Sequence, residues 1–294
     1  MDAKRRLVWV SFAPLEKAAQ ALSSSVASVR YRLIIPARAL DGDGFESRVT
    51  YVSAGANRRT LLERFQGAQA VVFGKLLAAP DGFTREAEQA LELMAQLRAR
   101  GVAVLADYSD DHFADPLRGP AYTAIANAVN GVVASTPGLA EVIKQHTSVP
   151  VSVITDPVEG LRAEPRVAER PPYRLLWFGH PLNLDTLKHG LPQLERVVAE
   201  IPHLLTLVTA PGAGAESFRP GRFRAWSSQA MQEELQSCDA VVIPSNPHDP
   251  RKAVKSPNRF TESVWAGRFV LAHALPLTKS SPTTAGSERI SARA

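Results

Sequence analysis

The segment KSPNRFTESVWAGRFVLA, residues 255–272, combines the residue types that bind a phosphorylated ligand. Lys255 and Arg259 supply positive charge, and Asn258 supplies an amide, at the start of a stretch with helical spacing. The first turn of a helix has unpaired N–H groups and the positive end of the dipole, which favour a diphosphate. Glu262 follows one turn after Asn258, where its carboxylate can accept hydrogen bonds from a diol such as ribose. The pattern predicts a nucleotide diphosphate site, and a solvated basic loop with a surface glutamate is the alternative.

A second polar group, ADYSDDHF at residues 106–113, directly follows an apolar run. Asp107 and Asp111 are our candidate catalytic residues there, because a carboxylate could orient or deprotonate an acceptor hydroxyl. Two alternatives remain open for this group. Asp110 or Asp111 could cap the next helix while Asp107 stabilises a loop, or the cluster could bind a divalent cation. We assign no residue as a metal ligand.

The strands and helices that would position these groups can be predicted from the sequence. Short apolar runs alternate with stretches in which apolar residues recur every three or four positions. In the first half of the chain the runs are 7–12, 48–53, 70–74, 102–107, 131–136 and 151–156, with a helix expected at 84–101. In the second half they are 173–179, 203–209, 223–226, 239–245 and 268–272, with helices expected at 184–200 and 228–237. This alternation predicts an α/β protein with two Rossmann-like parallel sheets. Parallel sheets bind ligands beyond the carboxyl ends of their strands, so we expect functional residues just after strands.

Composition changes along the chain predict the domain boundaries. Residues 1–156 form an expected acceptor-side domain, and the Pro-, Glu- and Arg-rich residues 157–172 a linker. Residues 173–275 form the expected donor domain. The Ser/Thr/Ala-rich residues 276–294 have too few apolar side chains to order themselves. Residues 28–40 are ambiguous, and we predict a helix that is kinked or begins near Pro36.

Charge and composition narrow the class of partner. The chain has 294 residues, a formal charge of +5 and a pI near 9.5, which suit an anionic ligand. The single cysteine, Cys238, excludes an internal disulfide framework and is expected in the core. No apolar run reaches the roughly 18 residues of a membrane span. We therefore expect a cytoplasmic protein with at most peripheral contact with the membrane.

The order of several segments resembles the GT-B glycosyltransferases, especially those of family 4 and family 1. The basic-Asn-Arg-x2-Glu-x3-Ala-Gly-Arg pattern after DAVVIPS is similar to their nucleotide-sugar donor site. Further likeness lies in GVAVLADYSDDHF, GVVASTPGLAEVI, VSVITDPVEG with Asp156 where Asn is usual, and YRLLWFGHPLNLDTLKHGLPQLERV. The resemblance covers roughly residues 5–275 and implies two facing Rossmann-like domains. In this family the chain usually continues through further helices, so we expect the donor domain to be incomplete at its C-terminal end.

The resemblance also implies roles for individual residues. Glu262 matches the second Glu of the family's Glu-x7-Glu pair and would hold the donor ribose, whereas Val254 stands at the position of the first Glu. Lys255 would supply a cation to the diphosphate. The other donor-binding candidates are Gly179, His180, Lys188, Asn258 and Arg259.

The implied reaction is transfer of a sugar from a nucleotide diphosphate-sugar to an acceptor hydroxyl. Protein cations would stabilise the leaving diphosphate, with no bound metal or other cofactor required. The acceptor expected from the resemblance is a cell-surface polysaccharide, a lipid-linked glycan or another hydroxyl compound. The nucleotide, the sugar and the stereochemical outcome stay open.

Three other functions are compatible with the residues. One is a nucleotide-sugar epimerase of the same architecture, and a second is a degenerate, non-catalytic sugar-nucleotide or glycan-binding protein. The third, a nucleic-acid-binding protein, is disfavoured because the cations are scattered and no binding motif is present.

Overall fold

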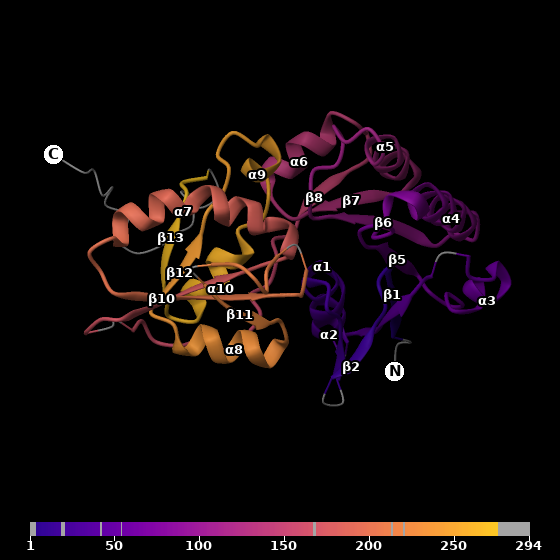
Figure 1. The fold of residues 1–294 in the computed structure, drawn as a ribbon. Helices are drawn as coiled ribbons and strands as arrows, with labels where there is room; N and C mark the ends of the chain where they lie inside the picture. The colour runs from indigo at the N-terminus through magenta and orange to yellow at the C-terminus, as the bar shows by residue number, and fades with distance from the viewer. Residues whose placement is uncertain are drawn as a thin grey trace.

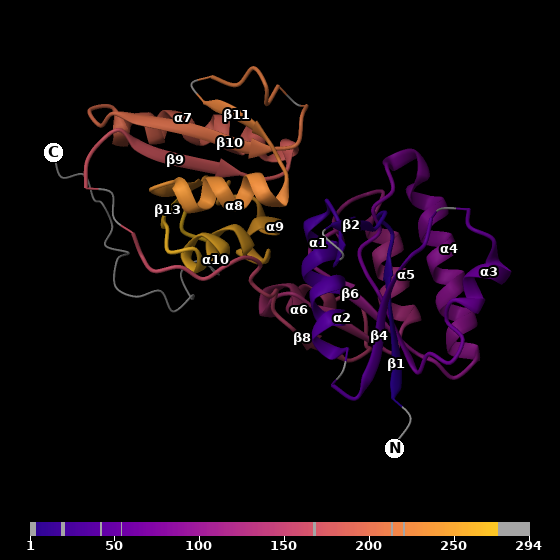
Figure 2. The same ribbon diagram turned by 90° about the horizontal axis from the view of Figure 1, so that it is seen from below.

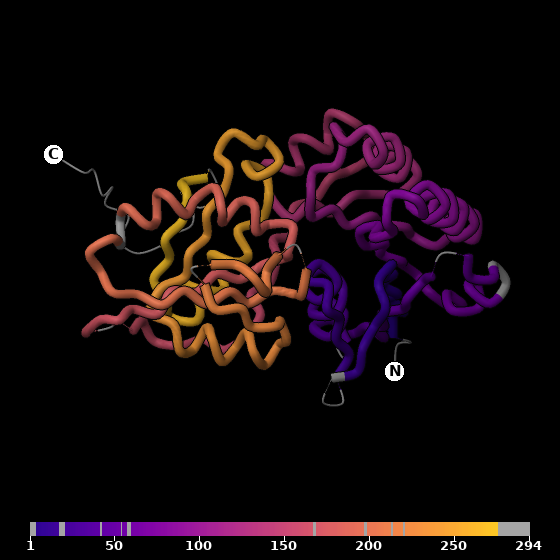
Figure 3. Tube along the Cα trace, in the orientation of Figure 1, coloured from indigo at the N-terminus to yellow at the C-terminus, as the bar shows by residue number. Residues whose placement is uncertain are grey.

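Two parallel sheets lie side by side in the computed structural model, each with helices on its faces (Figure 1). The structure describes residues 4–275 except 19–20, 42, 54, 167–168, 213 and 220. The indigo and magenta half and the orange and yellow half are each one continuous stretch of sequence (Figure 3). The α/β class and the two Rossmann-like sheets are as predicted. The tail at 276–294, and with it the expected incomplete end, lies outside the described residues.

The first sheet has the strand order β4-β1-β5-β6-β7-β8, and all its pairings are parallel. Its strands are β1 Arg5–Ser11, β4 Phe45–Tyr51, β5 Ala70–Phe73, β6 Ala103–Tyr108, β7 Gly131–Ala134 and β8 Val151–Val153. The order reverses between β1 and β5, whose neighbouring carboxyl ends create the crevice typical of such sheets.

Helices cover both faces of this sheet. One face packs against α3 Arg58–Glu63, α4 Pro80–Ala99, α5 Gly119–Ala128 and α6 Pro137–Lys144. The opposite face packs against a continuous helical segment made of α1 Ala27–Val29, the π-helix η1 Arg30–Ile34 and α2 Ile35–Leu40. Strands buried on both faces explain the uninterrupted apolar runs of the sequence.

The helix predicted over 28–40 is confirmed, but its irregularity precedes Pro36. The π-helical turn ends at Ile34, and Pro36 follows two residues later inside the continuous helical segment, where it cannot donate a backbone hydrogen bond to the preceding turn. A hairpin of β2 Glu16–Ala18 and β3 Ala21–Ser23 was not predicted. Its strands are too short and too exposed to show a clear apolar pattern.

The second sheet has the order β11-β10-β9-β12-β13, again parallel. Its strands are β9 Tyr173–Phe178, β10 His203–Thr209, β11 Arg222–Ala225, β12 Ala240–Ile243 and β13 Phe269–Ala272. The helices are η2 Pro181–Asn183, α7 Leu184–Val198, α8 Ser228–Ser237, α9 Pro250–Ala253 and α10 Asn258–Trp265. α7 and α8 cover opposite faces (Figure 2). Here the order reverses between β9 and β12.

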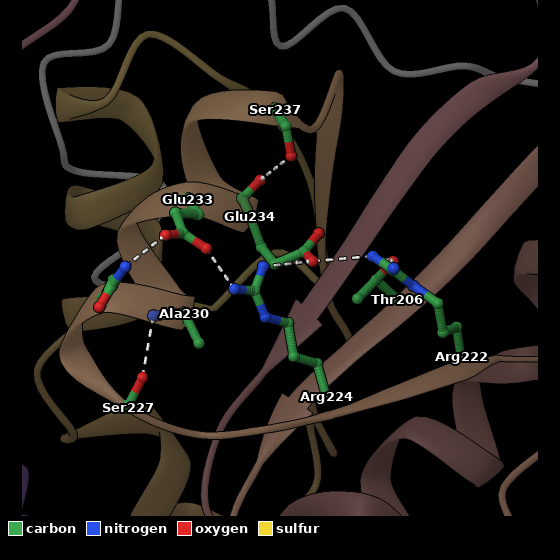
Figure 4. A network of polar contacts seen from close by, with 9 residues as sticks. Thr206, Arg222, Arg224, Ser227, Ala230, Glu233, Glu234 and Ser237 are labelled. Carbon is green, nitrogen blue, oxygen red and sulfur yellow. Dashed lines mark hydrogen bonds and ion pairs between the residues drawn. The ribbon is translucent and has the colours of Figure 1, made fainter.

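A buried carboxylate fastens α8 to the edge of this sheet (Figure 4). Glu234 accepts hydrogen bonds from Arg222 at 2.7 Å and from Arg224 at 2.8 Å, and Arg224 also pairs with Glu233. Ser227 caps the helix by accepting from the N–H of Ala230 at 3.0 Å. The predicted helix at 228–237 is thus held by its cap and by its partners on β11.

Residues 154–166 and 169–172 join the two sheets without helix or strand. Part of this segment runs beside the second half, where the N–H of Ala163 donates to Trp265 O at 3.0 Å and that of Arg166 to Gly267 O at 3.1 Å. The described residues of the predicted linker, 157–172, lie within this segment, and the domain boundaries stay predictions.

Candidate functional site

Loops that follow strands of both sheets meet between the two halves. Lys75 follows β5, Asp110 follows β6, and Lys255 lies in the loop before α10. Asp110 Oδ2 lies 2.6 Å from Lys75 Nζ, and its Oδ1 lies 2.8 Å from Lys255 Nζ. One carboxylate therefore links an ammonium group of the first half to one of the second.

The charge state of Asp110 follows from these neighbours. Burial alone would raise its pKa, but the charges of Lys255 and Lys75 hold the pKa far below its ordinary value. The carboxylate is consequently ionised throughout the neutral range, and it cannot serve there as a proton acceptor.

His180 and Lys252 lie near the same group. Burial lowers the pKa of His180, and the nearby charges of Lys75 and Lys255 lower it further. Burial likewise lowers the pKa of Lys252, with help from Lys255 and Arg259. The smaller contributions of Lys75, Lys255 and Arg259 to these shifts indicate positive charge near the carboxyl ends of β9 and β12.

Arg259 and Gly179 meet at the start of α10. Arg259 Nη1 donates to the carbonyl of Phe178 at 3.2 Å, and a Cβ at Gly179 would lie 3.4 Å from the same nitrogen. Burial lowers the pKa of Arg259 to about 10. Asn258 begins α10, and its Oδ1 accepts from Ser256 Oγ at 2.6 Å. The structure thus brings Gly179, His180, Lys255, Asn258 and Arg259 to one place.

Glu262 lies one turn further along α10 and accepts a hydrogen bond from the hydroxyl of Tyr31 in the first half. Burial raises the pKa of Glu262 to about 7, although the bond from Tyr31 opposes this. A carboxylate that is partly protonated at neutral pH can still accept from a donor hydroxyl. In this structure the Tyr31 hydroxyl occupies one hydrogen-bonding position of the Glu262 carboxylate.

The residues on either side of Tyr31 also bind other parts of the chain. Arg30 Nε lies 2.8 Å from Glu159 Oε2, and its guanidinium lies 5.1 Å from the ring centroid of Trp226, beyond β11. This places a cation–π contact between the two halves. The π-helical segment therefore contributes directly to the interface.

Asp107 lies in a different environment from the one predicted. Its two oxygens accept from Arg32 at 2.8 and 2.7 Å, and only 4% of the residue is exposed. Arg32 also binds Asp156 at 2.9 Å and the carbonyl of Ile154 at 2.6 Å. Because a buried guanidinium needs its charge balanced, this geometry favours a structural role for Asp107.

Asp111 and Lys188 make hydrogen bonds or ion pairs only to groups close to them in sequence, among the contacts that the structure describes. Asp111 Oδ1 accepts from the N–H of Phe113 at 3.0 Å, which forms a local turn ahead of α5 and not the helix cap considered as an alternative. Lys188 pairs with Asp185 at 3.3 Å on the surface of α7, with half of its side chain exposed. Their catalytic and donor-binding roles stay predictions without geometric support.

Val254, which stands at the position of the first Glu, packs against the first half. Its carbonyl accepts from Thr136 Oγ1 at 2.6 Å, and a Cβ on Gly138 would lie 3.2 Å from its Cγ1. Together with the contact of Lys255 to Asp110, this fixes the loop between α9 and α10 to the opposite half.

Sequence reasoning underrated Lys75, Asp110 and Tyr31. Lys75 carried one usable signal, since it directly follows a strand at the reversal of strand order. Asp110 is distinguished from Asp107 and Asp111 by its partners Lys75 and Lys255, which are distant in sequence. A local sequence pattern does not reveal such partners.

Comparison with known proteins gives no match in sequence and clear matches in structure. No protein-family model matches the chain, and no curated protein matches it. The solved alpha-glucosyltransferase (AGT) in complex with UDP superposes with a TM-score of 0.60 at 9% identity, covering 94% of this chain and 85% of that one. The apo lipopolysaccharide outer core galactosyltransferase WaaB gives 0.53 at 11% identity, covering 94% and 84%. A putative UDP-N-acetylglucosamine 2-epimerase from Listeria monocytogenes gives 0.52 at 9% identity, covering 92% and 79%.

The chain has the GT-B fold. At such low identities the likeness to other GT-B proteins establishes architecture alone. Among the described residues, no helix is both long and apolar enough to cross a membrane. Within the same residues, no group of three or more His, Cys, Asp or Glu side chains could hold a metal ion.

Proposed function

We propose that this GT-B protein is a glycosyltransferase that moves a sugar from a nucleotide diphosphate donor to an acceptor hydroxyl. The observation that carries the proposal is the meeting of Lys255, Arg259 and Glu262 at the reversal of strand order in the second sheet. Cations on the start of α10 suit a diphosphate, and Glu262 one turn later suits a ribose diol.

The same groups can lower the barrier of the transfer. Negative charge develops on the diphosphate as the glycosidic bond breaks, and fixed cations stabilise that charge without a metal ion. Gly179 has no side chain, and a Cβ there would contact Arg259. The glycine would therefore leave room for the phosphate to approach both the backbone and the guanidinium of Arg259. A glycan, a cell-surface polysaccharide precursor or a lipid-linked hydroxyl compound is the proposed acceptor, met in the cytoplasm or at its membrane surface.

A second candidate is a non-catalytic sugar-nucleotide or glycan-binding protein. Two observations favour it. Val254 has no group that could contact a sugar hydroxyl through its side chain, and Asp107 is engaged by Arg32.

Calorimetric titration with UDP, GDP, dTDP and ADP tests the donor site. We expect one nucleotide to bind, and both Lys255→Ala and Glu262→Ala to weaken it about tenfold or more. Lys144→Ala is the matched control, since Lys144 pairs with Glu141 at 2.7 Å and is as exposed as Lys255.

Two outcomes would count against the transferase. No nucleotide binding by the folded wild type would remove the donor site. Binding without hydrolysis or transfer of any nucleotide sugar tested would favour the non-catalytic protein.

A further inference from the structure

We propose that Lys75 binds the donor diphosphate from the first half, and that Asp110 is the counter-ion which the diphosphate displaces. The inference rests on the proposed nucleotide diphosphate site and adds a ligand from the opposite sheet. Asp110 thereby becomes a positioning residue in the unliganded protein.

The geometry of the pair carries the inference. Asp110 holds Lys75 and Lys255 through different oxygens, at 2.6 and 2.8 Å, so both ammonium groups border one anionic group. A phosphate offers neighbouring oxygens in a similar arrangement and carries more charge than a carboxylate. It can therefore take the place of the carboxylate between the two lysines.

The exposed fractions of the Lys75, Lys255 and Asp110 side chains indicate which of them can move when a ligand binds. Half of the Lys255 side chain and a quarter of the Lys75 side chain are exposed, against 17% for Asp110. A ligand that approaches from solvent thus reaches the ammonium groups before it reaches the carboxylate. Flexible lysine side chains can turn toward a new anion while the acidic turn stays in place.

The surrounding charges favour an anion over a second cation. Lys252 and Arg259 add positive charge nearby. His112 contributes none at neutral pH, since burial lowers its pKa to about 4 with Lys75 adding to the effect. Among the described residues, no carboxylate other than Asp110 forms an ion pair with Lys75 or Lys255.

Asp110 cannot act instead as the base for the acceptor. A carboxylate between two ammonium groups is too weak a base to take a proton near neutral pH. Its charge is useful in the empty site, where it prevents mutual repulsion of the lysines. On binding, the same charge competes with the ligand.

Calorimetry with inorganic pyrophosphate tests the exchange. We expect Asp110→Asn to bind pyrophosphate about tenfold tighter than the wild type, because a competing charge is removed. Lys75→Ala should bind it about tenfold more weakly, and Lys75→Arg should restore most of the affinity. Glu141→Gln, which breaks the pair with Lys144, is the control and should change nothing.

Several results would overturn the inference. These are weaker binding by Asp110→Asn, unchanged binding by Lys75→Ala, or no pyrophosphate binding by either the wild type or Asp110→Asn. Thermal unfolding of each variant shows that the folded protein was titrated. Failure of the proposed function would give a different result. Nucleotides would then bind no tighter than pyrophosphate, while the Lys75 and Asp110 variants would still change the affinity for pyrophosphate.

Discussion

Replacing Glu262 by glutamine measures the cost of holding this carboxylate between the two halves. Burial raises its pKa from the ordinary 4.5 to about 7. The folded protein therefore keeps a proton that the unfolded chain releases, and the associated stability is full below about pH 4.5 and lost as the pH rises through 7. The shift corresponds to roughly 3 kcal/mol, which partial access of water reduces to about 2 kcal/mol.

Glutamine keeps an oxygen that can accept from Tyr31 but carries no charge at any pH. In urea denaturation, we expect the variant to exceed the wild type in free energy of unfolding by less than about 1 kcal/mol near pH 5. The advantage should grow to about 2 kcal/mol near pH 8.5. Glu141→Gln is the control, because Glu141 is 71% exposed and should give no such trend. Parallel pH curves for Glu262→Gln and the wild type would refute the burial of a costly charge.

Three further changes test other parts of the structure. Asp107→Asn leaves Arg32 short of one charge, so urea denaturation should show a loss of about 3 kcal/mol while nucleotide binding by the folded fraction is kept. Gly267→Ala should lower the melting temperature strongly, since Gly267 has φ +70° and the new Cβ would lie 2.2 Å from Glu164 O. Cys238 should react slowly with a thiol reagent in the folded protein, because burial raises its pKa to about 12.

For each of these three predictions, a control or an opposite result tests the reasoning. Full stability of Asp107→Asn combined with loss of transfer would restore the catalytic assignment. Gly101→Ala is the control for the glycine, since Gly101 shares the positive φ but has open space around it, and it should cost only about 1 kcal/mol. Equal thiol reaction rates in buffer and in denaturant would contradict the burial of Cys238.

Both sheets could be predicted from sequence because their strands are buried on two faces. Such strands appear as uninterrupted apolar runs, and the amphipathic stretches between them could only be covering helices. The β2–β3 hairpin was not predicted, because neither of its strands exceeds three residues. The π-helical turn was not predicted either, since Leu33, Ala37 and Leu40 have the spacing of an ordinary helix.

The site was predictable only where it is local in sequence. Lys255, Asn258, Arg259 and Glu262 lie within two helical turns, so their spacing indicated a shared ligand. The pairing of Asp107 with Arg32 spans 75 positions, and that of Tyr31 with Glu262 spans 231. Contacts over that range leave no periodic pattern in the sequence, which is why Asp107 and Asp111 were assigned to chemistry while Asp110 was considered as a helix cap or cation ligand.

The π-helical turn also sets a limit on how the chain can vary in length. Removing one residue from Arg30–Ile34 would let the turn relax to ordinary helical geometry. The wide turn holds about one residue more than an α-helical turn, so the two ends of the helix would keep nearly their present orientation. Arg30 faces Glu159 and Trp226 while Arg32 faces Asp107 and Asp156, and a turn one residue shorter could not hold both arginines in their present positions. A deletion in this turn should therefore be tolerated less well than one in the β2–β3 hairpin.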